Sequence, residues 1–132
     1  MMSHIPSSIT ANHQDEDVLE GLVTAGALVA LADGRVQAVE RDELVNFMRQ
    51  LMPAIPDNQI GALFDRRVRE LKDRDVLTVV TEKLRALAGL SLASVVIRTA
   101  ERVAAADRQI HPNELQAIRL VRLFMASLQA RR

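Results

Sequence analysis

Apolar residues recur through most of this chain at the three- and four-residue spacing of an α-helix, and no segment alternates like a strand. We expect a first helix to begin near Asp15 and to run to about Ala32, because carboxylates at its start suit the positive end of the helix dipole. This segment is apolar on nearly every side, which is typical of a helix at the centre of a bundle.

Five further segments with one apolar face follow the first. The second expected helix stops before Pro53 and the third opens at Pro56. Gly89 is expected to end the fourth as a left-handed C-cap, Ser91 to cap the fifth, and Pro112 to lie in the first turn of the sixth. The pattern predicts an all-α fold, a compact bundle of about six to seven helices.

The mixed-charge run of residues 65–75 lies on the outer side of the third expected helix, and we interpret it as a solvated face with local ion pairs. Residues 1–14 are polar and are expected to form a flexible N-terminal tail, with residues 15–132 forming one helical domain. The longest apolar run, residues 22–32, is short of the roughly 20 residues that cross a bilayer. The N-terminus does not have the pattern of a secretory signal, so we expect a cytoplasmic protein without a membrane span.

Composition excludes several classes of function. The 132 residues include no cysteine, which removes thiol nucleophiles and thiolate metal sites. Lysine and arginine balance aspartate and glutamate at 17 each, and only three residues are aromatic, so we expect no nucleic-acid partner. Ser91 lies in a Gly-Leu-Ser-Leu-Ala segment, but no histidine or acid is placed to activate it, and a helix cap explains it better. We therefore expect no enzymatic activity.

The chain contains the same acidic motif twice. Residues 33–44 and residues 107–118 both read Asp-x-x-[Val/Ile]-x-x-x-Glu-x-x-x-[Leu/Ile], at an offset of 74 positions. The same offset aligns further apolar residues, such as Val29 with Val103. The first and second helices are therefore expected to recur as the fifth and sixth, which gives the bundle an internal two-fold helix-turn-helix repeat.

The first copy, Ala32-Asp33-Gly34-Arg35-Val36 followed by Glu40 and Leu44, resembles the tellurite-resistance TerB family, a domain also related to the N-terminal region of DjlA-type co-chaperones. The resemblance extends over residues 15–130. It implies a small, non-enzymatic, cytoplasmic protein associated with tellurite and other chemical-stress resistance, working with a partner near the inner membrane. It also implies candidate metal ligands at the motif positions, which are Asp33, Glu40, Asp107 and Glu114 in this chain.

Physical reasoning leaves the role of these four acids open. Four carboxylates brought together by a two-fold repeat would suit a hard divalent cation such as Ca²⁺, Mg²⁺ or Mn²⁺. His111 lies within the second copy and, if it takes part, shifts the preference towards Zn²⁺ or Ni²⁺. No cofactor is fixed by the sequence beyond this candidate cation.

The alternative is that the acids only cap helices. Asp33 and Asp107 directly follow an expected helix, whereas Glu40 and Glu114 fall near the third residue of the next, the acidic position of a capping box. Gln37 and His111 stand at the cap positions instead of serine or threonine, so the box would be incomplete. A third possibility is an acidic docking patch.

Arginines near the motif offer an alternative to a metal as partners of the acids. Arg35, Arg41 and Arg108 are close enough in sequence to neutralise the acids. Arg108 also replaces Gly34 of the first copy, and at a positive φ it would be less favourable than glycine by about 1 kcal/mol.

The leading hypothesis is a TerB-like stress protein that binds a divalent metal through the repeated acids. The alternative is a metal-independent interaction module that docks a membrane-associated or chaperone partner through a helix face. Under either hypothesis we expect a protein partner, and self-association into a homodimer stays open.

Overall fold

The computed structural model describes the backbone of residues 4–89, 92–106, 108 and 111–130. Side chains are described from residue 15 onward within these ranges, except those of residues 33, 86, 88, 89, 129 and 130. The described residues form helices and turns without any strand, which confirms the all-α prediction. The elements in chain order are α1 (His4–Ala30), the short 3₁₀ helix η1 (Leu31–Asp33), α2 (Ala38–Leu51), α3 (Asp57–Asp73), α4 (Val76–Gly89), α5 (Ala93–Ala104) and α6 (Pro112–Ala130).

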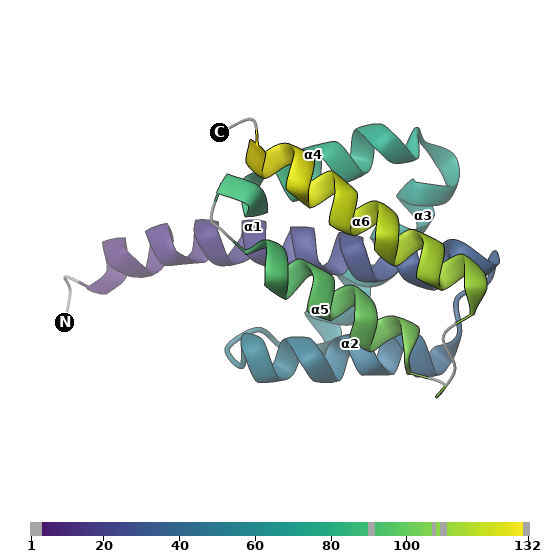
Figure 1. Cartoon of the computed structure of the whole chain (residues 1–132). Helices are drawn as coiled ribbons and strands as arrows, with labels where there is room; N and C mark the ends of the chain where they lie inside the picture. Colours follow the sequence, from purple (N-terminus) through teal and green to yellow (C-terminus); the bar gives the residue numbers. More distant parts are fainter. Residues whose placement is uncertain (1–3, 90–91, 107, 109–110, 131–132) are drawn as a thin grey trace.

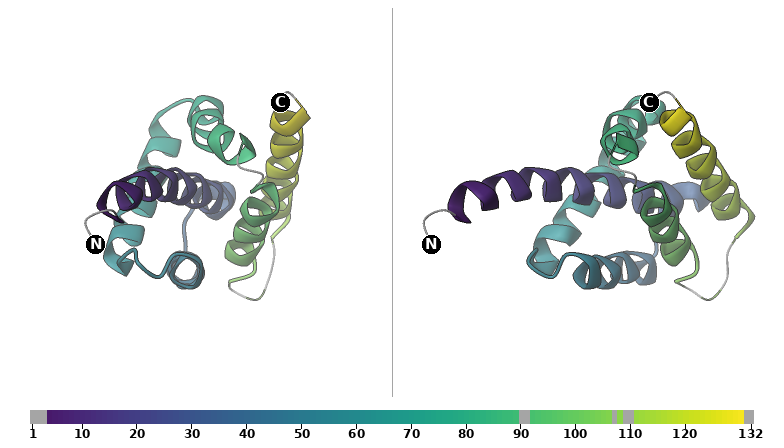
Figure 2. Two further views of the ribbon diagram at one scale, coloured as in Figure 1. Left: turned by 90° about the vertical axis from the view of Figure 1, so that its left-hand side faces the viewer. Right: turned by 60° about the vertical axis from the view of Figure 1, so that its left-hand side comes forward.

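The helix α1 lies in the middle of the bundle. In the left view of Figure 2, α4 lies above it, α2 below it, α3 on one side and α5 and α6 on the other. Leu22, Val23 and Val29 of α1 are fully buried, as expected for a helix that is apolar all round. Gly21 allows α4 to approach closely, because a Cβ at this position would overlap the Leu87 side chain. The buried apolar residues form two clusters, and α1 contributes side chains to both.

The start of α1 differs from the prediction. The helix begins at His4, well before Asp15, and its N-terminal end projects beyond the other helices (Figure 1). Pro6 does not prevent this start, because a proline in the first turn of a helix removes no intrahelical hydrogen bond. The prediction of a helix start near Asp15, which rested on the polar composition of the preceding residues, was therefore wrong.

The later helix boundaries agree closely with the pattern. The helix α2 ends at Leu51 before Pro53, α3 starts at Asp57, and Pro112 is the first residue of α6. Ser91, the expected cap of the fifth helix, lies outside the described residues, and the N-cap of α5 is Leu92. No described helix combines the length and the apolar character needed to cross a membrane.

The outer face of α3 is less solvated than its charges suggested. Arg67 is only 2% exposed and forms ion pairs with Glu20 of α1 and Glu70 of α3. Its long apolar stem lets a charged residue lie in the interface while its guanidinium reaches two carboxylates. The interpretation of this run as a solvated face was therefore wrong at Arg67, whose side chain connects α3 to the central helix, whereas its ion pair with Glu70 is one of the expected local pairs.

Candidate functional site

The two acidic motifs place their glutamates in the same local geometry. Glu40 in α2 and Glu114 in α6 are 1% and 0% exposed. The Oε1 atom of Glu40 accepts a hydrogen bond from the backbone N–H of Gln37 at 2.9 Å, and that of Glu114 accepts one from the N–H of His111 at 3.1 Å. Each glutamate therefore holds the first turn of its own helix by satisfying a backbone donor that the helix itself leaves free.

The two aspartates of the motif are less fully described. Asp33 is the last residue of η1, but its side chain lies outside the described residues, as does all of Asp107. Among the side chains that the structure does describe, no three histidines or acids lie close enough to hold a metal ion together. Whether the structure brings all four acids together thus stays a prediction.

Glu114 has one feature that capping does not explain. Its Oε2 atom is buried and has no hydrogen-bond partner among the described residues, although its Oε1 atom is satisfied. An ionised carboxylate oxygen held away from water is unfavourable unless a donor or a cation compensates it. The second acidic turn is therefore the better candidate for a cation, with Glu114 and Asp107 as oxygen ligands and His111 as a nitrogen ligand.

The residue after each motif aspartate has a left-handed backbone. Gly34 has a φ of 87° and Arg108, 74 positions later, has a φ of 69°. The position thus requires a positive φ in both turns, and Arg108 adopts it at the steric cost that its Cβ entails. The second turn therefore has the left-handed conformation that glycine favours, although arginine stands at this position.

The neighbouring arginines do not all serve to neutralise the acids. Arg41 instead forms a bidentate salt bridge with Asp65 of α3. Its Nε atom lies 2.9 Å from Oδ1 and its Nη2 atom 3.0 Å from Oδ2 of that carboxylate. The hydrogen bond to Asp65 raises the pKa of Arg41, so this guanidinium stays charged at any physiological pH. Arg35 and Arg108 are exposed, and neither has an ion pair with another described residue.

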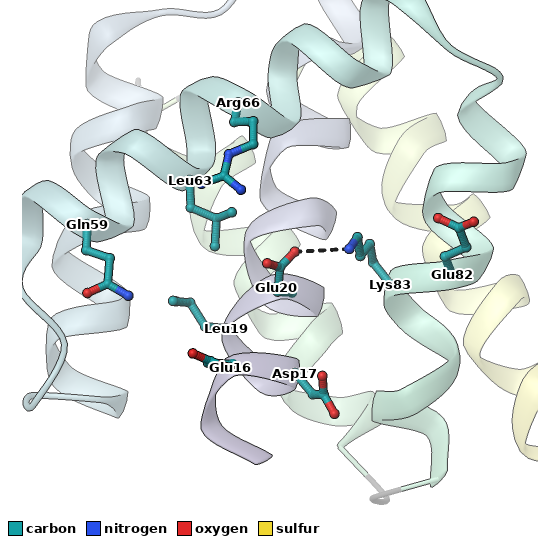
Figure 3. Close-up of a pocket in the computed structure, with 9 residues that line it drawn as sticks. All are labelled: Glu16, Asp17, Leu19, Glu20, Gln59, Leu63, Arg66, Glu82 and Lys83. Carbon is teal, nitrogen blue, oxygen red and sulfur yellow. Dashed lines mark ion pairs between the residues drawn. The ribbon is translucent and has the colours of Figure 1, made fainter. Parts of the chain in front are cut away.

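A charged pocket of about 420 Å³ lies where α1, α3 and α4 meet (Figure 3). Glu20 is at its centre, with its Oε1 atom 3.3 Å from the Nζ atom of Lys83 and also paired with Arg67. The other carboxylates do not converge on Glu20: Glu16 and Asp17 point to different sides, and Glu82 lies beyond Lys83 (Figure 3). The arrangement is therefore a junction that holds three helices together.

A second hollow region is apolar and runs between α4 and α6 over the end of α1; we call it the α4–α6 groove. It consists of two hollows of about 330 and 520 Å³ that share Leu28, Val76 and Leu120 in their walls. Val80, Val121 and Phe124 also line the first hollow, and Lys72, Gln116 and Gly34 the second. Leucines on its rim are strongly exposed: Leu77 by 64% and Leu120 by 53%. Such a surface can bind an apolar partner surface.

Sequence reasoning did not find this groove. The sequence of α6 does contain an indication of an exposed apolar surface. Residues 120, 121, 123 and 124 are all apolar and form a stripe wider than a single neighbouring helix can cover. Only the placement of α4 beside α6 shows which part of that stripe is left exposed.

Comparison with known proteins supports the resemblance seen in the motifs. The family model described as "Tellurite resistance protein TerB" matches residues 19–127, which is most of the chain. Searches of curated proteins and of solved structures found no match. The matched range contains both acidic turns and both walls of the α4–α6 groove. The chain belongs to the TerB family of tellurite resistance proteins.

Proposed function

We propose that this TerB-family protein is a non-enzymatic, cytoplasmic interaction module in tellurite and chemical-stress resistance, and that it docks a partner protein in the α4–α6 groove. The observation that carries the proposal is the concentration of exposed apolar side chains at this groove. Seven large apolar residues of the described chain are notably exposed, and three of them, Val76, Leu77 and Leu120, line this groove. Clustered exposure of this kind is typical of a binding surface, whereas single exposed leucines are ordinary.

The test is a resistance assay with a matched pair of variants. Cells made tellurite-sensitive by deletion of their own TerB-family gene would carry this chain, the groove variant Leu77→Gln/Leu120→Gln, or the control variant Leu51→Gln/Leu115→Gln. Leu51 and Leu115 are each 42% exposed and do not line the groove. We expect the unaltered chain and the control to restore growth and the groove variant to fail, at equal protein levels. Growth with the groove variant would contradict docking at this groove.

A second candidate function is divalent-cation binding at the acidic turns, supported by the unpartnered Oε2 atom of Glu114. In this proposal Asp107, Glu114 and His111 hold the ion in the second turn, with Asp33 and Glu40 as the matching residues of the first. A cation there would offset the cost of burying the Glu114 carboxylate. The first turn has weaker support, because the Glu40 carboxylate has no corresponding unpartnered atom.

Thermal unfolding of chelator-treated protein, titrated with Ca²⁺, Mg²⁺, Mn²⁺, Zn²⁺ and Ni²⁺, tests the cation. A ligand at a hundredfold over its dissociation constant adds about 2.7 kcal/mol to the free energy of unfolding, which raises the Tm by roughly ten degrees in a domain of this size. Glu114→Gln is the informative variant, because the amide oxygen still accepts the His111 N–H while the charge is gone. A flat response to all five ions would leave the glutamates as helix caps.

A further inference from the structure

We propose that the occupant of the α4–α6 groove is an amphipathic helix of a partner protein, with leucine-type side chains that fill the groove and acidic residues along its flanks. This inference rests on the proposed docking function and specifies the chemistry of the partner. It follows from the shape of the groove, its exposed apolar area and the charges around it.

The shape of the groove favours an inserted ridge of side chains. Two hollows lie in line and meet at Leu28, Val76 and Leu120, so the concave surface is elongated along the seam between two helices. A helix with anchors at i, i+3 or i+4, and i+7 presents successive side chains along such a seam. A bilayer surface has no fixed ridge that could fill the two hollows.

The charge at the groove is positive. Lys72 is the one charged residue among the residues that line the two hollows, and it has no ion pair with a described residue. The single carboxylate of α6 is Glu114, which is buried. Acidic flanks on the partner helix would therefore face an unpaired cation.

The nearest carboxylates in sequence do not reverse this charge. Asp73 and Asp75 flank the turn between α3 and α4, but neither lines the groove. Asp75 is occupied at the start of α4, where its two carboxylate oxygens accept hydrogen bonds from the Leu77 N–H and the Thr78 hydroxyl. Glu82 lines the charged pocket with α1 and α3, on the other side of α4.

A second copy of the chain fits this surface less well. Two copies would bring the same cation, Lys72, to one interface, with no acidic residue in the lining of the groove to pair with it. The charge of the groove therefore favours a different chain as the partner.

The test uses two synthetic helical peptides that share leucines at the spacing of one helix face and differ only in glutamate or lysine at the flanking positions. Fluorescence anisotropy would measure their binding to the full chain and to two variants, Leu77→Gln/Leu120→Gln and Lys72→Glu. All three side chains are exposed, so we expect the variants to fold, and thermal unfolding checks this. We expect the glutamate peptide to bind at least tenfold more tightly than the lysine peptide.

Each variant has its own expected result. The leucine variant should lose at least tenfold in affinity for the glutamate peptide, and the charge variant should prefer the lysine peptide. Equal binding of the two peptides, or no binding of either, would overturn the acidic partner.

Two other outcomes would assign the groove to a different occupant. A concentration-dependent dimer abolished by Leu77→Gln/Leu120→Gln would assign it to a second copy. Groove-dependent binding to phosphatidylserine vesicles without peptide binding would assign it to a membrane. If resistance depends on the groove but neither peptide binds, the proposed docking function is retained and the acidic partner helix is rejected.

Discussion

Two grooves of the molecule differ in the polarity of their walls. One lies between α2 and α3 and the other between α4 and α6, and α2 and α6 carry the two copies of the sequence motif. The α2–α3 side is polar, and the Arg41–Asp65 and Arg49–Asp57 ion pairs connect its two walls. On the α4–α6 side, no ion pair between described residues joins the walls.

The difference can be traced to individual positions. At an offset of 74 residues, Asn46 of α2 corresponds to Leu120 of α6, and Arg49 corresponds to Leu123. These positions are polar in α2, where ion pairs connect it to α3, and apolar and exposed in α6. The exposed leucines of α6 are therefore not part of the sequence motif that the two helices share.

The largest expected effect concerns how α3 is held in place. Arg67→Ala removes a side chain that is 2% exposed and leaves Glu20 and Glu70 without their common partner. Breaking such a buried pair should lower the free energy of unfolding by about 3 kcal/mol, measured by urea denaturation. Arg66→Ala, at an exposed neighbouring position, is the control and should change it by less than about 0.5 kcal/mol. Equal effects of the two variants would show that the ion pairs do not hold α3.

The second prediction concerns a substitution that places the polar residue of α2 at the corresponding position of α6. Leu120→Asn should weaken binding of the glutamate peptide at least tenfold, or about 1.4 kcal/mol, because an exposed apolar side chain that lines both hollows is lost. The free energy of unfolding should change by less than about 0.5 kcal/mol, since this side chain is mostly in water. Anisotropy and urea denaturation give the two values. A large loss of stability with full binding would reverse the interpretation of the groove.

The third prediction compares the turns that lead into α2 and α6. Gly34→Ala should cost about 1 kcal/mol purely from its φ of 87°, because no heavy atom lies within 4 Å of the new Cβ. Arg108→Gly should stabilise the protein by up to about 1 kcal/mol, because glycine adopts a φ of 69° without strain. Urea denaturation measures both. A destabilised Arg108→Gly would indicate that the guanidinium makes a contact worth more than the strain.

The smallest effect is electrostatic and lies at the exposed end of the α2–α3 groove. The hydrogen bond from Arg49 lowers the pKa of Asp57 below its usual 3.8. Since the pKa is depressed in the folded state, the stabilisation is present above pH 3.8 and is lost as the pH falls through the folded-state pKa. Arg49→Gln should raise the pKa of Asp57 towards 3.8 in an NMR titration, whereas Arg66→Gln should leave it unchanged. An unchanged pKa in Arg49→Gln would show that the pair does not persist in solution.

The sequence by itself determined the helices, the central place of α1 and the family, because each is set by local spacing or by a motif. It also placed Glu40 and Glu114 at the third residue of their helices, where the structure finds both as buried acceptors of backbone N–H groups. The early start of α1 was missed because the polar composition of its first turns favours a tail as much as a helix.

Only the tertiary structure decided which surfaces are covered. The burial of Arg67 depends on Glu20, which lies 47 positions earlier in the chain, and the apolar stripe of α6 is open or closed according to where α4 packs. A helical pattern records which side of a helix is apolar, but not how much of that side a neighbour covers. Covered area depends on the angles and distances between helices, which are set by the packing of the whole core.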